Sequence, residues 1–146
     1  NPDHIDKING KAKARGLEHL SAVEDINLVL GGEGSDVLMI EVVEHMKEDK
    51  AIELLEQVLE KKPERVIITT PNRSFNKNFF DDPNAVSQED HDFEMNEMEF
   101  AQYIKMGVAN TGYQSEIFGI GDAVDGVQMT QGAIITRIPL AKEKVV

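Results

Sequence analysis

The sequence contains no cysteine and no tryptophan among its 146 residues, and only 5% of the residues are aromatic. Without cysteine, neither a disulfide nor a thiolate zinc site can form. No apolar run reaches the roughly 18 residues of a membrane-spanning helix, and no secretory signal is visible. We therefore expect no membrane association and predict a cytoplasmic location.

Positive charge is also scarce. The chain has 15 Lys and Arg residues against 27 Asp and Glu, a formal net charge of −12. Broad, non-specific nucleic-acid binding needs a cationic surface that displaces counterions, so this balance disfavours it. A small local basic site is still compatible with the composition, and acidity also favours solubility. The length suffices for one core, and we predict a single domain over residues 1–146.

Strand and helix patterns alternate along the chain. Continuous apolar runs at 35–42 and 65–70 are typical of buried parallel strands. Apolar residues at helical spacing predict helices at 47–62 and 96–112, the second with Asn96 as N-cap and Glu99 at the capping-box position. The other segments are a basic helix followed by a short strand at 17–23, a polar loop at 71–92, and final strands at 113–121 and 127–138.

This order predicts an α/β fold with a mostly parallel sheet and an antiparallel pair of C-terminal strands at one edge. Sites in such sheets lie beyond the carboxyl ends of the strands. Two of these ends carry polar chemistry, "EVVEH" and "TTPNRSFN", and we expect them to be neighbours in space. The glycine clusters at 31–34 and 119–121 do not join a strand to a helix, so we predict turns there and no phosphate-binding loop.

Glu41, Glu44 and His45 follow the first buried strand at positions i, i+3 and i+4. If they begin a helix, they share one face, and their ligand types suit Mn²⁺, Fe²⁺, Co²⁺ or Zn²⁺ better than Ca²⁺. Acidic residues are also common at helix starts, because they complement the helix dipole. His91, in the acidic segment "EDHDFE", fits either a second ligand group or a solvated loop. Taken alone, these residues leave both interpretations open.

Five segments, in this order and at these separations, resemble a known family: "IEVVEHM", "VIITTPNRSFN", "DHDFEMNEMEF", "GYQSEIFGIG" and "MTQGAIITR". They are similar to the small-RNA 3′-terminal ribose 2′-O-methyltransferases. Members of that family carry an E-x-x-E-H helix start, a T-P-N-x-x-[YF]-N segment, a D-H-x-F-E-W segment and a late T-Q-x-A strand. The resemblance covers roughly residues 17–138 and implies part of a Rossmann-like class I methyltransferase sheet.

The resemblance also implies a chemistry. Such enzymes use S-adenosylmethionine and a divalent metal, usually taken as Mn²⁺, which holds the 2′ and 3′ hydroxyls of the last ribose of an RNA. The metal makes the 2′ hydroxyl a better nucleophile toward the methyl group. Matched residue by residue, the catalytic metal ligands are Glu41, Glu44, His45 and His91, with Phe93 and Glu94 as their support. An RNA-repair or RNA-silencing partner is implied as well, without being identified.

The segment "PNRSFNKNFF" interleaves cations with phenylalanines. Such a mixture suits a terminal nucleotide, with phosphate on the cations and a base on a ring. The phenylalanines could equally anchor a long loop to the core. As substrate-binding residues we predict Asn72, Arg73, Phe75, Asn76 and Lys77.

The chain departs from the family pattern in two ways. No first strand with a glycine-rich cofactor loop is visible, so we expect the N-terminal cofactor-binding part of the fold to be missing, and we assign Asp6, Asp25 and Ile26 to the remaining cofactor contacts. Around the RNA side, Ser74 replaces a glutamate, Met95 a tryptophan, and Asn96 and Glu97 a threonine–arginine pair. Glu97 would remove a phosphate contact.

Two further hypotheses compete with the RNA methyltransferase. One is a partial or degenerate domain that binds a metal or a partner without catalysis. The other is a non-heme metal enzyme that uses the same Glu and His cluster on another substrate. Binding of S-adenosylmethionine separates the first of these from the methyltransferase, and turnover that needs metal but not the cofactor identifies the second.

Overall fold

The computed structural model describes residues 2–140 of the chain. The chain separates into two compact units, Asn1–Leu30 and Gly31–Val146, which are described in turn. The prediction of a single domain over the whole chain stays a prediction. In the part of the chain that the structure describes, no helix is both long and apolar enough to cross a membrane.

The first unit consists of helix α1, Pro2–Ala14, and a short 3₁₀ helix, Ile26–Leu28. The strand predicted at 17–23 is wrong, because this segment is irregular. The backbone of Ala22 is occupied in another way: its N–H donates to Oδ1 of Asn9 at 2.7 Å, and its carbonyl accepts from Nδ2 of Asn9 at 3.0 Å. A side chain of α1 therefore satisfies the groups that a neighbouring strand would otherwise pair.

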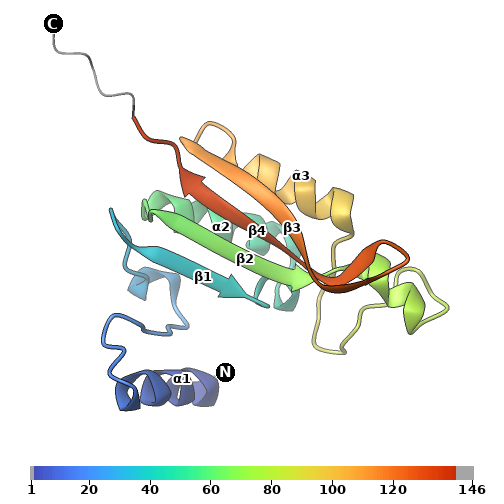
Figure 1. Cartoon of the computed structure of the whole chain (residues 1–146), viewed down its shortest axis with the longest axis horizontal. Helices are drawn as coiled ribbons and strands as arrows, with labels where there is room; N and C mark the ends of the chain where they lie inside the picture. Colours follow the sequence, from blue (N-terminus) through green and yellow to red (C-terminus); the bar gives the residue numbers. More distant parts are fainter. Residues whose placement is uncertain (1, 141–146) are drawn as a thin grey trace, which may run out of the picture. The chain divides into compact units, whose positions relative to one another are not determined.

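The second unit is built on a four-stranded sheet in the order β1-β2-β4-β3 (Figure 1). The strands are β1 Asp36–Ile40, β2 Arg65–Pro71, β3 Tyr113–Val124 and β4 Val127–Arg137. The pairing of β1 with β2 is parallel, and the pairings of β2 with β4 and of β3 with β4 are antiparallel. The predicted α/β class and the antiparallel C-terminal pair are confirmed, and parallel and antiparallel strands are mixed in the sheet.

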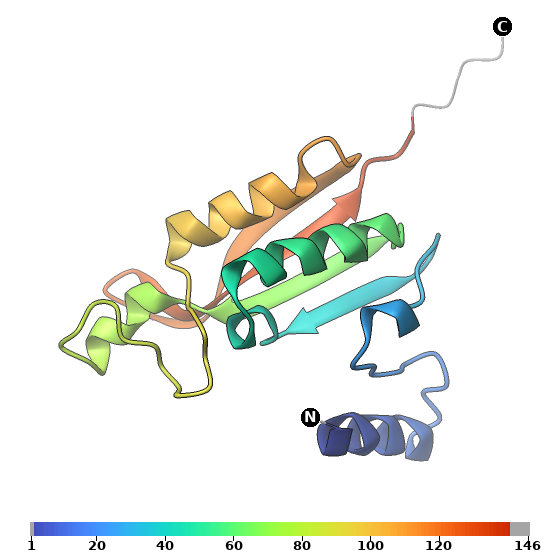
Figure 2. The same cartoon turned by 180° about the vertical axis from the view of Figure 1, so that it is seen from behind.

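Two helices, α2 Glu48–Glu60 and α3 Glu97–Val108, lie on the same face of this sheet (Figure 2). Their apolar residues bury the side chains that β1, β2 and β4 direct to that face, where each exposed fraction is below 10%. The Tyr103 hydroxyl of α3 donates to the carbonyl of Ala51 in α2 at 3.0 Å, which ties the helices together. The core consists mainly of Val37, Met39, Ala51, Leu55, Val58, Val66, Ile68, Phe100, Ile104, Ala133 and Ile135.

The predicted start of α3 is confirmed in detail. The Asn96 side chain accepts from the Glu99 N–H, and the Glu99 carboxylate accepts from the Asn96 N–H, each at 2.9 Å. The helix ends at Val108, four residues before the predicted end at Gly112. Asn110 and Gly112 have φ angles of 58° and 76°, a left-handed backbone that does not continue a right-handed helix.

The two glycine clusters differ from each other. Residues 31–34 form a turn as predicted, with Gly32 and Gly34 at φ of 102° and 79°. The predicted turn at 119–121 is wrong, because these residues belong to β3. A register shift between Ile120 and Ala123 absorbs the positive φ of Gly121, and the chain reverses later, at Asp125 and Gly126.

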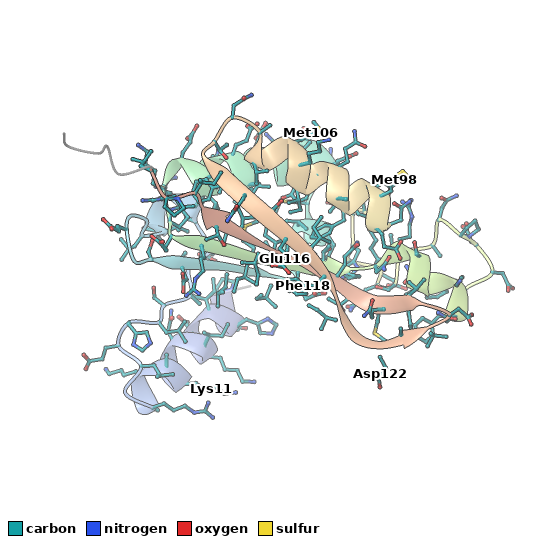
Figure 3. The ribbon with its side chains drawn as sticks, turned by 45° about the horizontal axis from the view of Figure 1, so that its top comes forward. Lys11, Met98, Met106, Glu116, Phe118 and Asp122 are labelled. Atoms are coloured by element: carbon teal, nitrogen blue, oxygen red, sulfur yellow. The ribbon has the colours of Figure 1, made fainter. Side chains whose placement is uncertain are left out.

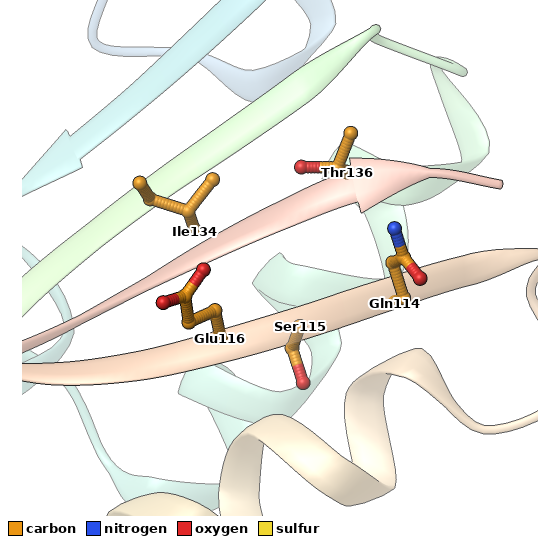
Figure 4. Close-up of a pocket in the computed structure, with 5 residues that line it drawn as sticks. All are labelled: Gln114, Ser115, Glu116, Ile134 and Thr136. Carbon is orange, nitrogen blue, oxygen red and sulfur yellow. The ribbon is translucent and has the colours of Figure 1, made fainter.

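The opposite face of the sheet has no helix of the second unit over it in the described residues. Leu38 and Ile40 of β1 are 53% and 50% exposed on this face. Figure 3 labels Phe118 and Glu116, which lie on β3, and Met98 and Met106, which lie on α3. A shallow depression on β3 and β4 is lined by Gln114, Ser115, Glu116, Ile134 and Thr136 (Figure 4).

Candidate metal centre

The segment after β1 does not begin an α-helix, so the condition under which Glu41, Glu44 and His45 would share one helical face is not met. Glu41 adopts a left-handed backbone with φ of 52°, and Val43–His45 then form a single 3₁₀ turn. Helix α2 starts only at Glu48. The three polar residues therefore do not share a helical face: Glu44 is buried, whereas Glu41 and His45 are exposed.

A second segment brings His91 to the same place. The N–H of Asp92 donates to the carbonyl of Glu44 at 2.7 Å, which fixes the loop from η3 to α3 against the turn after β1. The His45 and His91 rings meet edge to face, with centroids 4.7 Å apart and planes at 85°. Glu44, His45 and His91 each offer one ligand atom, and these three atoms lie within 4.8 Å of one another.

Both imidazoles are oriented through Nδ1. In His91, Nδ1 lies 2.6 Å from Oε1 of Glu94, and in His45 it lies 3.1 Å from the carbonyl of Asp90. Among the described residues, neither Nε2 has a hydrogen-bond partner, and Nε2 of His45 lies 4.0 Å from Oε1 of Glu44. Fixing one ring nitrogen so that the other is free is how proteins present a metal-binding histidine.

The Glu94 carboxylate that holds His91 is itself held from several sides. The Ser87 N–H donates to its Oε1 at 2.8 Å, the Ser87 hydroxyl donates to the same oxygen, and Nδ2 of Asn76 donates to its Oε2 at 2.5 Å. Burial alone raises the pKa of Glu94, but the hydrogen bonds from Ser87, His91 and Asn76 outweigh it, so the pKa lies below its ordinary value. Glu94 therefore stays ionised and supports the imidazole of His91.

Glu44 has the opposite electrostatics and provides the test of whether a cation fits. Its exposed fraction is 1%, and its Oε1 has no hydrogen-bond partner among the described residues. Its Oε2 accepts from the Thr70 hydroxyl at 3.0 Å. Burial raises the pKa of Glu44, and the negative charge of Glu41 raises it further. A buried, half-satisfied carboxylate next to two free imidazole nitrogens is a donor set that fits a divalent transition-metal ion.

Glu41, the fourth predicted ligand, stands outside this group. Its Oε1 accepts from the Thr69 hydroxyl at 2.8 Å, and its side chain is exposed. Since its charge acts on Glu44, it belongs to the same neighbourhood. Its role as a ligand stays a prediction.

Three of the five predicted RNA contacts are buried. Asn72, Phe75 and Asn76 are 3%, 6% and 4% exposed. Asn72 caps the 3₁₀ helix η3, Arg73–Asn78, and Asn76 supports Glu94. These side chains build the wall of the site, so the structure does not offer them to a nucleotide.

The two cations of this segment differ in availability. Arg73 is held by the Glu99 carboxylate at 2.8 Å and by the Glu94 carbonyl at 3.1 Å. Lys77 is exposed. The aromatic rings that reach the surface are Phe79 and Phe80, which are 60% and 40% exposed, and not Phe75. The sequence pattern alone does not tell that Phe79 and Phe80 are exposed and that Phe75 is buried.

The departure at Glu97 has a local explanation. Its carboxylate accepts from the Ser74 hydroxyl at 2.5 Å and from Nδ2 of Asn72 at 3.1 Å. Burial alone raises the pKa of Glu97, but these hydrogen bonds outweigh it and lower the pKa overall. Residues 74 and 97, where the sequence departs from the family pattern, are therefore partners of each other. The change at 97 alters a contact inside the wall of the site.

The predicted cofactor residues all lie in the first unit. Asp6 is in the middle of α1, and Asp25 caps the 3₁₀ helix that contains Ile26. The strand predicted at 17–23, which would precede Asp25, is absent from the described residues. The cofactor contacts of Asp6, Asp25 and Ile26 stay predictions. Residues that the sequence did not single out include Thr70, Ser87 and Asp90, whose partners only the folded chain reveals.

Comparisons with known proteins show which proteins the chain is similar to. No family model matches the chain. The chain is 31% identical over 107 residues to a small RNA 2′-O-methyltransferase of Tetrahymena thermophila, an alignment that covers 70% of this chain and 25% of the relative. The chain thus spans about a quarter of the length of that curated relative.

Two solved structures share its fold. A chain of the Pnkp1/Rnl/Hen1 RNA repair complex superposes with a TM-score of 0.72 at 28% identity, over 94% of this chain and 30% of that one. The small RNA methyltransferase HEN1 superposes with a TM-score of 0.69 at 28% identity, over 83% of this chain and 16% of that one. Its sequence relative and its fold agree, and both make the chain similar to a part of the methyltransferase domain of the small-RNA 2′-O-methyltransferases.

Proposed function

We propose that the chain supplies the metal-binding part of an enzyme that methylates the 2′ hydroxyl of the 3′-terminal ribose of an RNA. The observation that supports this most directly is the group formed by Glu44, His45 and His91, with one unpartnered buried carboxylate oxygen. The likeness to small RNA 2′-O-methyltransferases supplies the reaction class. A chain of an RNA repair complex among its structural neighbours further favours an RNA substrate.

The proposed chemistry divides into what bound groups supply and what the residues do. When bound, a divalent cation, which we take to be Mn²⁺, favours loss of a ribose hydroxyl proton, and S-adenosylmethionine supplies the methyl group. Glu44, His45 and His91 hold the cation, and Glu41 is the candidate fourth ligand once it releases Thr69. Glu94 and the carbonyl of Asp90 keep the two imidazoles in the orientation that leaves Nε2 free.

The RNA contacts follow from what the surface offers. Phe79 and Phe80 are exposed rings at the end of η3, with ring centroids 6.4 Å apart, and Lys77 is an exposed cation on the same helix. Exposed aromatic rings stack on unpaired bases, and a nearby cation suits phosphate. Asn76 connects this surface to the metal centre, because it belongs to η3 and donates to Glu94. We propose that Phe79, Phe80 and Lys77 contact the terminal nucleotide, and that Phe75 does not.

Periodate sensitivity of a short RNA tests the reaction. The whole protein is incubated with Mn²⁺, S-adenosylmethionine and an RNA with a free 3′ end. Periodate cleaves a free vicinal diol but not a 2′-O-methylated one, so resistance that requires both additions is the expected result. His91→Ala should abolish it, whereas Glu89→Gln, an exposed change in the same loop, should not. RNA that stays fully sensitive although the cofactor binds would exclude the proposed substrate.

A second candidate is a metal-binding domain without catalysis. It is favoured by one feature, namely that neither glycine cluster in the described residues joins a strand to a helix as a cofactor loop does. Calorimetric titration of the whole protein with S-adenosylmethionine separates the two. The methyltransferase requires a binding signal, and the non-catalytic domain predicts none at any cofactor concentration that saturates active relatives.

A further inference from the structure

Helix α1 carries a stripe of positive charge that the proposed reaction does not use. Residues 7–17 contain Lys7, Lys11, Lys13 and Arg15 and no acidic residue, although acids outnumber cations 27 to 15 in the chain as a whole. Lys7, Lys11 and Arg15 are four residues apart, so they fall within about 80° of one another around the helix axis, each about 6 Å further along it. These three residues are called the cationic stripe.

The packing of the first unit turns this stripe outward. Asn9 forms both hydrogen bonds to Ala22, and Ala12 is 4% exposed, so these residues face the segment that follows the helix. Asn9 lies about 160° from both Lys7 and Lys11 around the axis. All three residues of the stripe are exposed. Arg15 follows the end of α1, but its N–H still bonds to the carbonyl of Lys11 at 3.2 Å and so continues the last turn.

The stripe also has its charge free for a ligand. Among the described residues, the Lys and Arg residues in ion pairs are Lys50, Arg65 and Arg73, and none lies on α1. Arg73, one of the two cations in the predicted RNA segment, already forms an ion pair with Glu99. Lys11 is labelled on α1 in Figure 3. The stripe is therefore a row of three exposed cations with no ion pair among the described residues, and Asp3 lies one helical turn before it.

We propose that the cationic stripe of α1 binds the phosphate backbone of the RNA substrate, as a second contact besides the terminal-nucleotide site. The inference rests on the proposed function for the identity of the polyanion. A row of cations at regular spacing along a helix suits a polyphosphate chain, and it carries no base specificity. An anionic membrane is the weaker match, because α1 has only two large apolar residues, Ile5 and Ile8, for insertion.

Salt-dependent RNA binding tests the stripe. Fluorescence anisotropy measures the affinity of the whole protein for a labelled single-stranded RNA, without cofactor or added metal, over a series of KCl concentrations. The variant Lys7→Gln/Lys11→Gln/Arg15→Gln should bind at least about tenfold more weakly, and its log–log salt slope should fall by about 2, since each phosphate contact on a single strand contributes about 0.7. Gln has a similar helix propensity to Lys and Arg, so α1 should persist.

The matched control removes the same charge elsewhere. Lys50→Gln/Lys62→Gln/Lys105→Gln changes three exposed cations of the second unit and should keep most of the affinity and the slope. Equal losses in both triple variants, or no salt-dependent RNA binding by the wild type, would overturn the inference. Stripe-dependent binding to phosphatidylserine vesicles without stripe-dependent RNA binding would overturn it too. Stripe-dependent RNA binding without a periodate-resistant product would support the stripe and contradict only the proposed reaction.

Discussion

The carboxylate of Glu94 holds the imidazole of His91 in the candidate metal centre and lies outside the group of three candidate ligands. It receives hydrogen bonds from Ser87 and Asn76 and contacts Nδ1 of His91. Such support commonly changes metal affinity by tenfold to a hundredfold. The candidate centre therefore extends beyond the three residues that would touch a cation.

We expect Glu94→Gln to weaken Mn²⁺ binding by about tenfold to a hundredfold, because an amide supports the imidazole of His91 less strongly than a carboxylate does. Isothermal titration of the whole protein with Mn²⁺ measures this. Glu89→Gln, in the same loop but exposed, should bind Mn²⁺ as the wild type does. Equal affinities of Glu94→Gln and wild type would remove Glu94 from the site.

The raised pKa of Glu44 makes stability depend on pH when metal is absent. A carboxyl whose pKa is raised by folding stabilises the protein below its unfolded pKa, and this contribution is lost as the pH rises through the folded pKa. In the presence of a chelator, Glu44→Gln should therefore be more stable than the wild type at neutral pH, by about 1–3 kcal/mol. The advantage should shrink near pH 4.5, which is the ordinary pKa of the group.

Thermal unfolding with and without Mn²⁺ checks this prediction. Added Mn²⁺ should raise the melting temperature of the wild type and leave that of Glu44→Gln nearly unchanged. The wild type should then have the higher melting temperature of the two. A wild type that is the more stable protein in chelator at neutral pH would show that the Glu44 carboxylate has a partner that compensates its burial.

At the scale of single residues, the sequence indicated which polar side chains gather better than it indicated their surroundings. Glu44, His45 and His91 come together as predicted, although not on a helix. Phe75 and Phe79 look equivalent in sequence, yet one is 6% exposed and the other 60%, because the turns of η3 decide which ring meets the core. The residue types in a sequence do not tell which of two such phenylalanine rings is buried.

The two helices of the second unit approach closely at one point. An ideal Cβ added to Gly107 in α3 would lie 2.3 Å from Cδ2 of Leu55 in α2. Alanine favours a helix over glycine by about 1 kcal/mol, but the clash should outweigh this. We expect Gly107→Ala to lower the free energy of unfolding by about 1–2 kcal/mol, as measured by urea denaturation.

A double-mutant cycle gives the control. In a Leu55→Ala background the clash is removed, so Gly107→Ala should be neutral or stabilising there. Gly10→Ala in α1, where an added Cβ meets nothing within 4 Å, should not destabilise. Additive effects of Gly107→Ala and Leu55→Ala would mean that the helices do not meet at this point.

At the scale of elements, periodicity and capping residues predicted most of the second unit. The strands at β1 and β2, both helices and the Asn96 cap follow from local pattern. The failures have physical causes outside the local sequence. The side chain of Asn9 hydrogen-bonds to the backbone N–H and carbonyl of Ala22. Glu41 adopts a left-handed backbone conformation. A register shift in the β3–β4 pairing accommodates the positive φ of Gly121 within a strand.

At the scale of the whole sheet, the feature that a sequence pattern could not reveal is the face opposite α2 and α3, over which the described part of the second unit places no helix. Parallel strands are usually covered on both faces, but Leu38 and Ile40 are about half exposed. We expect Leu38→Gln/Ile40→Gln to reduce binding of an apolar fluorescent dye and self-association, with a stability cost within about 1 kcal/mol. Dye titration and sedimentation measure these changes.

The control for this face lies on a helix. Met106→Gln replaces an apolar side chain of α3 that is 55% exposed, and it should leave dye binding nearly unchanged. A large loss of stability in the β1 variant would indicate that the two side chains are covered in solution.

The contact between the turn after β1 and the loop after η3 has a consequence for a chain without cysteine. A cation shared by His45 and His91 joins positions 46 residues apart and closes a segment that contains α2, β2 and η3. In the loop-entropy treatment of cross-links, a closure of this length restricts the unfolded chain by on the order of 4 kcal/mol. The proposed catalytic ion would then also act as a reversible staple, and depletion of the metal would loosen the fold as well as stop the chemistry.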